Sequence, residues 1–397
     1  MTITESSHTT TPLSRGLLWL LAATAGLGVA NLYYAQPLAA AITASLHAKP
    51  AEIGSTLMAT QIGYAFGMVL LVPLGDGRER RFIIVSTLLA AVPALLMLAA
   101  STSVAALLVS SLLVGVTSAV PQMVLPYAVD LAEPAERGKV VGTVMAGLLT
   151  GALLSRTVAG ALGTALGWRA VFVLAAIVMG LLAGVLRIKI PIREPAGRIA
   201  YAAILRSLAT VVRTEPVLRR RALIGGFGFA SLSVFWSMLS FHLKTLGQGS
   251  ATAGAFGAIG LIGVFVAPTA ARIATRTEPW RLNVFALTLA AISFAIFWLG
   301  RESLVFMGVG VVLLDAGVQA NQLTNQTVIF SLTPALRSRI NALYMVSYFA
   351  GGAAGTVCAS LAWSRGGWAA VCVTGAAFAL AAMLPLIGEK TRDAQGT

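Results

Sequence analysis

Apolar segments of about 20 residues or more follow one another along almost the whole of this 397-residue chain. An α-helix needs about 20 mostly apolar residues to cross the hydrocarbon core of a bilayer. Hydrophobic residues make up 57% of the chain and charged residues 11%, whereas soluble domains have about 45–50% and about 25%. The chain has too few polar residues to cover a water-soluble fold, so we expect an all-α membrane protein.

The apolar segments fall into two sets of six predicted spans. The first set lies near residues 16–41, 52–74, 82–100, 104–130, 140–163 and 168–188, and the second near 221–243, 250–271, 282–299, 303–330, 340–363 and 367–387. The expected organisation is an N-terminal tail at 1–15, a six-helix bundle at 16–188, an Arg-rich central linker at 189–220, a second bundle at 221–387 and a C-terminal tail at 388–397.

The basic residues are distributed very unequally between the two sets of loops. The net charge of +14 would suggest nucleic acid in a soluble protein, but these charges lie in loops between spans, so we expect no nucleic-acid partner. The loops and tails on one side hold 22 Lys and Arg, and the other side holds five, namely Lys49, Arg169, Lys244, Arg301 and Arg365. By the positive-inside rule both termini and the linker are cytoplasmic, as in a multi-pass protein of the bacterial inner membrane.

The two halves match each other at a spacing of 200 residues. The pairs include Gly26 with Gly226, Gly28 with Gly228, Leu32 with Leu232, Gly54 with Gly254, Gly63 with Gly263, Gln122 with Gln322, Pro134 with Pro334, Arg137 with Arg337, and Trp168 with Trp368. Parallel repeats of six helices, related by an axis along the membrane normal, are a transporter architecture with a central site near the midplane. The repeat therefore predicts a transporter whose two bundles move about that site.

Asp315 lies near the middle of the tenth predicted span and corresponds to Gly115 in the first half. An acid at the centre of a spanning helix costs about 2.5–3.5 kcal/mol on insertion scales, so it should face protein or a water-filled cavity. Gln319, Gln322 and Gln326 follow it in a stripe roughly 60° wide. We interpret Asp315 as a proton or substrate site lined by these glutamines, while a structural polar network between helices stays open as the alternative.

Arg156 is the other charge inside a span and corresponds to Thr356 in the second half. It could line the cavity and bind an anionic or hydroxyl-rich substrate, or it could lower the proton affinity of Asp315 in one state. Alternatively, it could snorkel or bond to carbonyl groups. Its depth differs from that of Asp315 by roughly 8 Å, so the spacing leaves open whether the two form a direct ion pair. Gln122, the repeat partner of Gln322, is expected to face Gln322 across the axis.

Further polar and aromatic residues are candidates to line the same cavity. They are Asn31 and Tyr34 on the first span, Ser233 and Trp236 on the seventh and Tyr344 on the eleventh. Their aromatic rings could bracket an apolar or ring-shaped substrate, or they could serve only as packing or interfacial residues. An acid that holds a proton when buried and releases it when water enters could tie proton flow to substrate flow.

Other classes of function lack their sequence signals. The chain has no GxxxxGK[ST] loop and no HExxH pair, and its two cysteines and three histidines form no metal-ligand pattern. We expect no enzyme activity, no metal and no cofactor. The expected energy source is the proton gradient, and the expected partners are a small-molecule substrate and the lipid bilayer, with the chain acting as a monomer.

The loop after the second span reads PLGDGRERR over residues 73–81 and resembles the G-x-L-x-D-R-x-G-R-R motif of the major facilitator superfamily. Asp76, Arg80 and Arg81 occupy the Asp position and two basic positions of that motif. The resemblance implies that Asp76 contacts the start of the eleventh span and that a motif Arg pairs with an acid ending the fourth, here Asp130. Such a gating latch would hold the cytoplasmic side closed.

Two further segments resemble one branch of the drug:proton antiporters in that superfamily. NLYYAQPL at residues 31–38 is similar to the first span of the sugar and purine-nucleoside efflux branch, and LSRTVAG at 154–160 to its fifth span. The resemblance implies alternating-access export of a sugar, nucleoside or drug-like molecule in exchange for protons. A proton-independent facilitator or an uptake symporter of the same fold stays open as the alternative.

Overall fold

The computed structural model describes residues 14–74, 78–192, 201–260, 278–332 and 337–387, and the regular elements in these ranges are helical. The first half contains α1 (Arg15–Ala30), α2 (Ala35–Ser45), α3 (Pro50–Leu70), α5 (Arg80–Ala99), α6 (Val104–Thr117), α7 (Val120–Leu131), α8 (Arg137–Leu166) and α9 (Trp168–Lys189). The rest contains α10 (Tyr201–Thr214), α11 (Pro216–Thr245), α13 (Pro279–Leu299), α14 (Leu304–Phe330), α15 (Arg337–Ala381) and the short 3-10 helix η2 (Leu384–Leu386).

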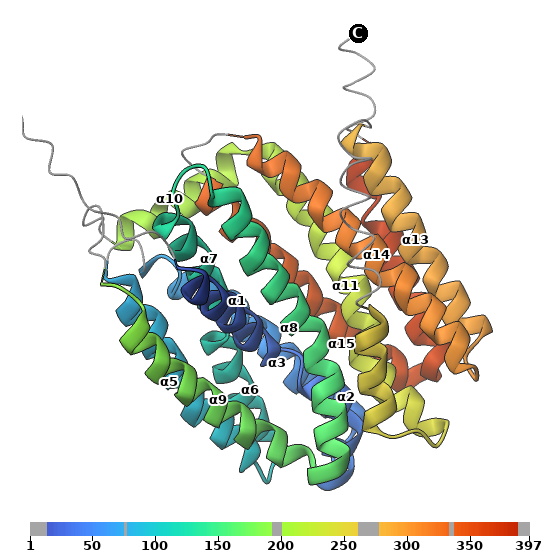
Figure 1. The fold of residues 1–397 in the computed structure, drawn as a ribbon. Helices are drawn as coiled ribbons and strands as arrows, with labels where there is room; N and C mark the ends of the chain where they lie inside the picture. The colour runs from blue at the N-terminus through green and yellow to red at the C-terminus, as the bar shows by residue number, and fades with distance from the viewer. Residues whose placement is uncertain (1–13, 75–77, 193–200, 261–277, 333–336, 388–397) are drawn as a thin grey trace, which may run out of the picture.

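The helices form two bundles that lie side by side, as Figure 1 shows. Ten helical segments in the described residues are long and apolar enough to cross a membrane. α15 contains two predicted spans, because its backbone leaves the helical region at Gly366 and Gly367. Residues 250–260 are the helical start of the eighth span, whose remainder lies outside the described residues. The predicted all-α fold of twelve spans in two bundles is confirmed.

Several helices begin at a capping serine or at a proline in the first turn. The Ser14 and Ser103 hydroxyls accept hydrogen bonds from the amides of Leu17 and Ala106, which would otherwise be unpaired at the starts of α1 and α6. Proline is tolerated in the first turn of a helix because the amide that it lacks has no partner there anyway. α3, α11 and α13 each have a proline at this position.

The same glycine-mediated crossing occurs once in each bundle. α1 crosses α8 where Gly26 meets Gly151, and α11 crosses α15 where Gly226 meets Gly351. A Cβ atom at any of these glycines except Gly226 would overlap the backbone of the partner helix. The glycines of the two crossings are 200 residues apart in sequence, so the repeat seen in the sequence is also a repeat of structure. Close contact of this kind is how helices associate in lipid.

Proline makes the two bundles differ. The first predicted span is broken by a turn at residues 31–34, before Pro37, and the fourth at residues 118–119, before Pro121. Proline lacks the amide hydrogen and its ring clashes with the carbonyl four residues earlier. The corresponding residues in the second half are Ser237 and Asn321, and there α11 and α14 run without interruption.

The central linker contains a helix that the sequence reading did not predict. α10 lies along one end of the bundles and buries Leu208 and Val211. The Tyr201 hydroxyl donates a hydrogen bond of 3.0 Å to the Leu70 carbonyl at the end of α3. We call this end of the molecule the linker end, and the other, where α2 and α11 finish, the opposite end (Figure 1).

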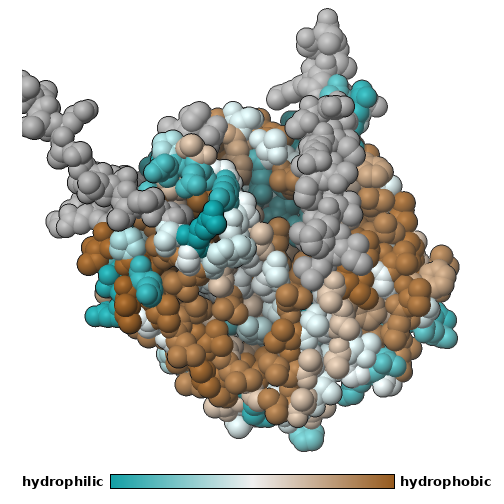
Figure 2. All heavy atoms as spheres, in the orientation of Figure 1, coloured by the Kyte–Doolittle hydropathy of each residue, from teal (hydrophilic) through white to brown (hydrophobic). Residues whose placement is uncertain are grey.

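The outer surface is apolar between these two ends. Figure 2 shows a broad hydrophobic band with hydrophilic residues collected above and below it. The exposed apolar side chains of the protein include Ile188, Leu299, Val305 and Val373, each 70% exposed or more. Apolar side chains exposed in this number would be unfavourable in water, so the band is the surface that contacts lipid.

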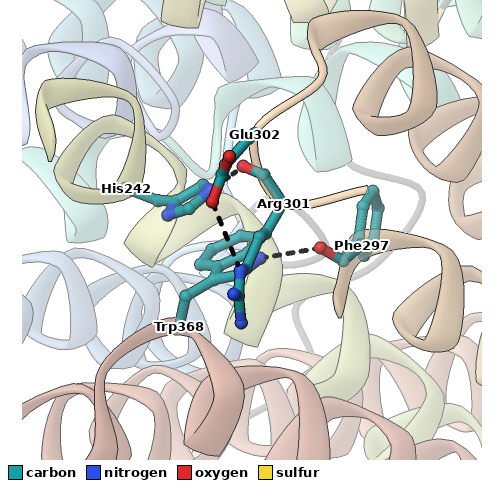
Figure 3. Close-up of polar contacts among 5 residues, drawn as sticks. All are labelled: His242, Phe297, Arg301, Glu302 and Trp368. Atoms are coloured by element: carbon teal, nitrogen blue, oxygen red, sulfur yellow. Dashed lines mark hydrogen bonds and ion pairs between the residues drawn. The ribbon is translucent and has the colours of Figure 1, made fainter. Parts of the chain in front are cut away.

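At the opposite end, an aromatic cluster packs helices of the second bundle together (Figure 3). His242 lies parallel to the Trp368 ring, with ring centroids 4.1 Å apart, and its Nε2 lies 2.7 Å from the Arg301 carbonyl oxygen. The Trp368 indole N–H donates to the Phe297 carbonyl at 3.0 Å. The cluster joins the end of α11, the connection between α13 and α14, and the start of the twelfth span.

The first bundle has a similar cluster with a different side chain stacked on tryptophan. Arg169 lies over the Trp168 ring at 4.2 Å and donates hydrogen bonds to the Ser101 carbonyl and to the Ser45 hydroxyl. Trp168 and Ser101 stand 200 residues before Trp368 and Arg301. Both bundles therefore close this end with a nitrogen-bearing side chain stacked on tryptophan, which is arginine in one and histidine in the other.

Candidate functional site

Two charged side chains lie deep between the bundles. Arg156 comes from the middle of α8 in the first bundle, and Asp315 comes from the middle of α14 in the second. Their exposed fractions are only 4% and 5%. Such side chains are costly inside a membrane protein unless the surroundings compensate their charge, so their neighbours define the site.

Arg156 is held in place by hydrogen bonds and by two aromatic rings. Its Nε donates to Gln36 Oε1 at 2.8 Å and its Nη1 donates to the Ala152 carbonyl at 3.0 Å. The Tyr33 ring lies 4.3 Å from the guanidinium carbon, and the Trp236 ring lies 4.2 Å from it. A desolvated cation–π contact is worth about 2 kcal/mol or more. Because Trp236 belongs to the second bundle, this contact also joins the two halves.

Asp315 lies beside the nitrogen-bearing edge of the Trp236 ring. The Trp236 indole nitrogen neighbours the Asp315 carboxyl group, yet the geometry stops short of a hydrogen bond, and Nε1 and Asp315 Oδ2 are both buried without a partner in the described structure. Arg156 and Asp315 are also more than 4.0 Å apart, beyond ion-pair distance. The direct pair that the sequence left open is therefore not formed here.

Glycines bring the start of the eighth span close to this site. A Cβ atom at Gly260 would lie 2.5 Å from Asp315 Oδ2, and one at Gly257 would lie 2.8 Å from Arg156 Cβ. Gly254 approaches the Arg156 carbonyl just as closely. Three glycines at successive turns thus let residues 250–260 cover both charged residues, which a helix with side chains at these positions could not do.

Contacts between the bundles close the site toward the opposite end. Thr157 Oγ1 donates to the Gly254 carbonyl at 2.9 Å, and Gly160 meets Gly254 directly. α2 also packs against α11. Each of these contacts lies beyond Arg156 as seen from the linker end, so the charged pair is sealed on that side.

Each of the two repeat-related glutamines has a partner in its own bundle. Gln122 donates to the Tyr64 hydroxyl at 3.1 Å, and Gln322 accepts from the Tyr348 hydroxyl at 3.0 Å. The Tyr64 ring lies 4.3 Å from the Phe349 ring, which is itself next to Tyr348. The aromatic rings of Tyr64, Phe349 and Tyr348 therefore form a chain of contacts between the two amides. The sequence predicted that the two amides face each other.

Most of the remaining predicted cavity residues lie on α14, in the turn between α1 and α2, or on α11. Gln319 and Gln326 are half-buried on the same helix as Asp315, and the Gln326 amide lies near the Met345 sulfur. Asn31 and Tyr34 are buried in the turn between α1 and α2, next to Tyr33 and Gln36. Ser233 is buried on α11, one turn before Trp236.

Tyr344 belongs instead to a second polar cluster that the sequence reading missed. Arg221, which is 1% exposed, donates from Nη1 to Asn283 Oδ1 at 2.7 Å and to Asn325 Oδ1 at 3.3 Å. Asn283 Nδ2 donates to Asn321 Oδ1 at 2.6 Å. Tyr344 neighbours Asn325 and Arg221. The cluster joins α11, α13, α14 and α15 inside the second bundle.

The first bundle has apolar side chains at all five equivalent positions. These are Leu21, Ile83, Pro121, Leu125 and Val144. The fold therefore does not require polar groups at this crossing, and their presence is specific to the second half. Comparing the halves at the spacing of 200 residues would have revealed the cluster from the sequence, because each member lacks a polar counterpart.

The gating motif is partly visible at the linker end. Arg80 forms an ion pair with Asp130 at the end of α7, as the motif implied. Arg81 donates from Nη1 to the Ile190 carbonyl at 3.2 Å. Asp76 and its expected contact lie outside the described residues. The Arg80 and Asp130 side chains are 25% and 51% exposed, so water and salt weaken their attraction.

Two related helical bundles about one axis, with buried charges of opposite sign between them, are the architecture of a membrane transporter. Residues 18–356 match the family model described as Major Facilitator Superfamily. The chain belongs to this superfamily, and it is a transporter, not an enzyme. The sequence-based expectation is confirmed at this level.

Curated relatives extend over nearly the whole chain. It is 39% identical over 384 residues to the putative uncharacterized transporter YgaY of Escherichia coli, covering 96% of this chain and 97% of the relative. It is 33% identical to the probable transporter SCO4007 of Streptomyces coelicolor, covering 92% and 85%. These relatives support a transporter and name no substrate.

Solved structures show the same fold at low identity. The nucleoside transporter NupG aligns with a TM-score of 0.76 and 12% identity, covering 94% of this chain and 99% of that one. A peptide transporter in complex with sulfate aligns with a TM-score of 0.77 and 15% identity, covering 94% of both chains. These likenesses establish the fold and leave the substrate open.

Proposed function

We propose that this chain exports small organic molecules across the bacterial inner membrane in exchange for protons, with Asp315 as the proton-binding group. The main support for this proposal is that Asp315 is the one acidic residue buried within the described structure. Its Oδ2 atom has no hydrogen-bond partner there. A carboxyl group in this position can bind a proton when the site is closed and release it when water enters.

The surroundings of the pair support a substrate with a ring and hydrogen-bonding groups. Aromatic rings of Tyr33, Trp236 and Tyr348 come from both bundles, and amides come from Gln36 and the stripe on α14. Ring faces bind planar apolar groups, and amides bind hydroxyl or carbonyl groups. A sugar, a nucleoside or a drug-like molecule has this combination, as the resemblance to the efflux branch also implies.

The expected orientation places the linker end in the cytoplasm. The excess of Lys and Arg lies in the loops at that end, which favours cytoplasmic termini. The closed contacts around Gly254 then separate the site from the outside. Substrate would enter from the cytoplasm and leave after these contacts open.

Transport by Asp315→Asn tests the proposal. In proteoliposomes with an imposed proton gradient, we expect the variant to lose uphill transport of a labelled purine nucleoside, a labelled pentose or a fluorescent cationic dye, whichever the parent protein carries. Exchange of that compound without a gradient should continue, because it requires no proton. Glu302→Gln, which changes a largely exposed acid, is the matched control.

Retained uphill transport by Asp315→Asn would exclude Asp315 as the proton site. The pH change on adding substrate to the same vesicles distinguishes the alternatives. Substrate entering the vesicles should drive protons out if the two are exchanged. Protons moving in with the substrate would indicate a symporter, and no pH change would indicate a facilitator.

A further inference from the structure

Trp236 is the residue that touches both charges of the site. Its ring covers the Arg156 guanidinium, and its indole nitrogen neighbours the Asp315 carboxyl group. We propose that Trp236 is a spacer that prevents Arg156 and Asp315 from forming a direct ion pair, which keeps Asp315 able to bind and release a proton. This inference rests on the proposed role of Asp315 and adds a positioning residue to it.

The position of Trp236 is fixed by its surroundings. The side chain is 3% exposed, and the Phe235 and Trp236 rings meet nearly edge to face with centroids 5.4 Å apart. Trp236 is in turn one of the groups that hold Arg156, together with Gln36, the Ala152 carbonyl and the Tyr33 ring on the other face of the guanidinium. Trp236 thus presents its face to Arg156 and its nitrogen-bearing edge to Asp315, and the two charged groups stay more than 4.0 Å apart.

The sequence repeat gives independent support for a dedicated role. Trp236 stands 200 residues after Gln36, so these are equivalent positions on the seventh and first spans. Both side chains act on Arg156, one by a hydrogen bond in the guanidinium plane and the other by stacking on its face. Equivalent positions of the two halves thus converge on one cation that the second half lacks.

A direct contact between Arg156 and Asp315 would prevent Asp315 from binding a proton. A carboxylate in direct contact with an arginine is strongly favoured in its ionised form, and a buried pair of this kind is costly to break. Asp315 would then keep its charge through the whole cycle and carry no proton. The pair would also tie the first bundle to the second, since Arg156 and Asp315 belong to different halves.

The other ionisable groups that face Asp315 do not replace the spacer. Tyr33, in the turn between α1 and α2, and Tyr348, on α15, lie near the Asp315 carboxyl group. The described part of the eighth span contributes Gly260 and no ionisable side chain. Arg156 is therefore the one cation that faces Asp315 among the described residues, and Trp236 is the side chain that touches both.

Infrared difference spectroscopy of the purified protein in lipid, recorded between alkaline and acidic buffer, tests the spacer directly. The parent protein should show the C=O band of a protonated carboxyl group, and Asp315→Asn should lack it. Trp236→Phe, which keeps a ring over Arg156, should retain the band. Trp236→Ala should lose it, because Arg156 can then reach Asp315 and hold it ionised. Trp236→Ala combined with Arg156→Gln should recover the band.

The outcomes separate this inference from the proposed function. A parent protein without an Asp315 band would overturn the proton site and the spacer with it. A band present in the parent and unchanged in Trp236→Ala would overturn the spacer alone, as would a lost band that Arg156→Gln does not restore. Where Trp236→Ala does not purify as a folded protein, Trp236→Leu, which also removes the aromatic ring, is read in the same way.

Discussion

At the scale of single residues, the candidate functional residues stand at positions where the two halves of the chain carry different residues. Arg156 and Asp315 have the uncharged partners Thr356 and Gly115, and the structure buries both between the bundles. The sequence could therefore identify the two charges. It could not show that Trp236 touches both, because contacts between residues so far apart in sequence depend on how the helices are packed.

Replacing Arg156 tests its role in the site. Arg156→Lys keeps the charge but loses the planar group that stacks on two rings and bonds to Gln36, so we expect transport to fall about tenfold or more, equivalent to at least about 1.4 kcal/mol. Arg156→Gln should fall further. Initial rates in proteoliposomes provide the measurement, and Arg301→Gln is the control because the Arg301 side chain is more than half exposed. Unchanged rates and substrate range in Arg156→Gln would rule out the cavity role.

The polar cluster around Arg221 allows a prediction about stability. Asn283→Leu removes the acceptor of an Arg221 hydrogen bond and the donor to Asn321. Each buried polar group left without a partner costs about 1–3 kcal/mol, so the melting temperature of the solubilised protein should fall by several degrees. Thr288→Ala, on the exposed face of the same helix, should leave it unchanged. A melting temperature equal to that of the parent would mean that the cluster contributes little to folding.

At the scale of helices, two of the spans are broken next to a proline. The first and fourth spans are interrupted just before Pro37 and Pro121, and the equivalent spans of the second half are continuous. Pro121 and Pro126 in the fourth span are prolines of the kind that kink a helix. The break in the first span carries more consequence, since it positions Tyr33 and Gln36 around Arg156.

Pro37→Ser makes the first span resemble the seventh, which has Ser237 at this position. Serine restores the missing amide hydrogen, so the turn at residues 31–34 should become helical and rotate Tyr33 and Gln36 away from Arg156. We expect transport to be lost while the melting temperature stays equal or rises. Hydrogen exchange of the amides at 31–36, which should slow down, is the measurement. Faster exchange, or full transport activity, would contradict this explanation of the break.

At the scale of the whole molecule, the bundles meet most closely where glycines allow it. Gly160 and Gly254 bring α8 against the eighth span at the opposite end, beside the hydrogen bond from Thr157. Packed interfaces of this kind have discrete arrangements and do not deform continuously. Closure at this end should therefore depend on the absence of side chains at the crossing.

Gly254→Leu should hold the opposite end open. A Cβ atom at residue 254 would lie 2.5 Å from the Arg156 carbonyl oxygen, so a larger side chain forces the bundles apart. Spin labels at positions 44 and 245, in a background with Cys358 and Cys372 replaced, should report a longer distance than in the unsubstituted protein. Gly249→Leu, where a Cβ meets nothing within 4 Å, is the control. Identical distance distributions would show that the crossing tolerates the side chain.

Residue order and composition were enough to predict the membrane class, the spans, the two-bundle repeat and two of the buried charges, Arg156 and Asp315, but not the buried Arg221. Lipid imposes these features on composition and spacing, because every span must be apolar and long enough to cross. The packing of the helices was needed to show that Trp236 and Gln36 converge on Arg156, that Arg156 and Asp315 stay apart, and that Tyr344 joins the Arg221 cluster. Those outcomes depend on the rotation and crossing of helices, which the hydropathy pattern does not encode.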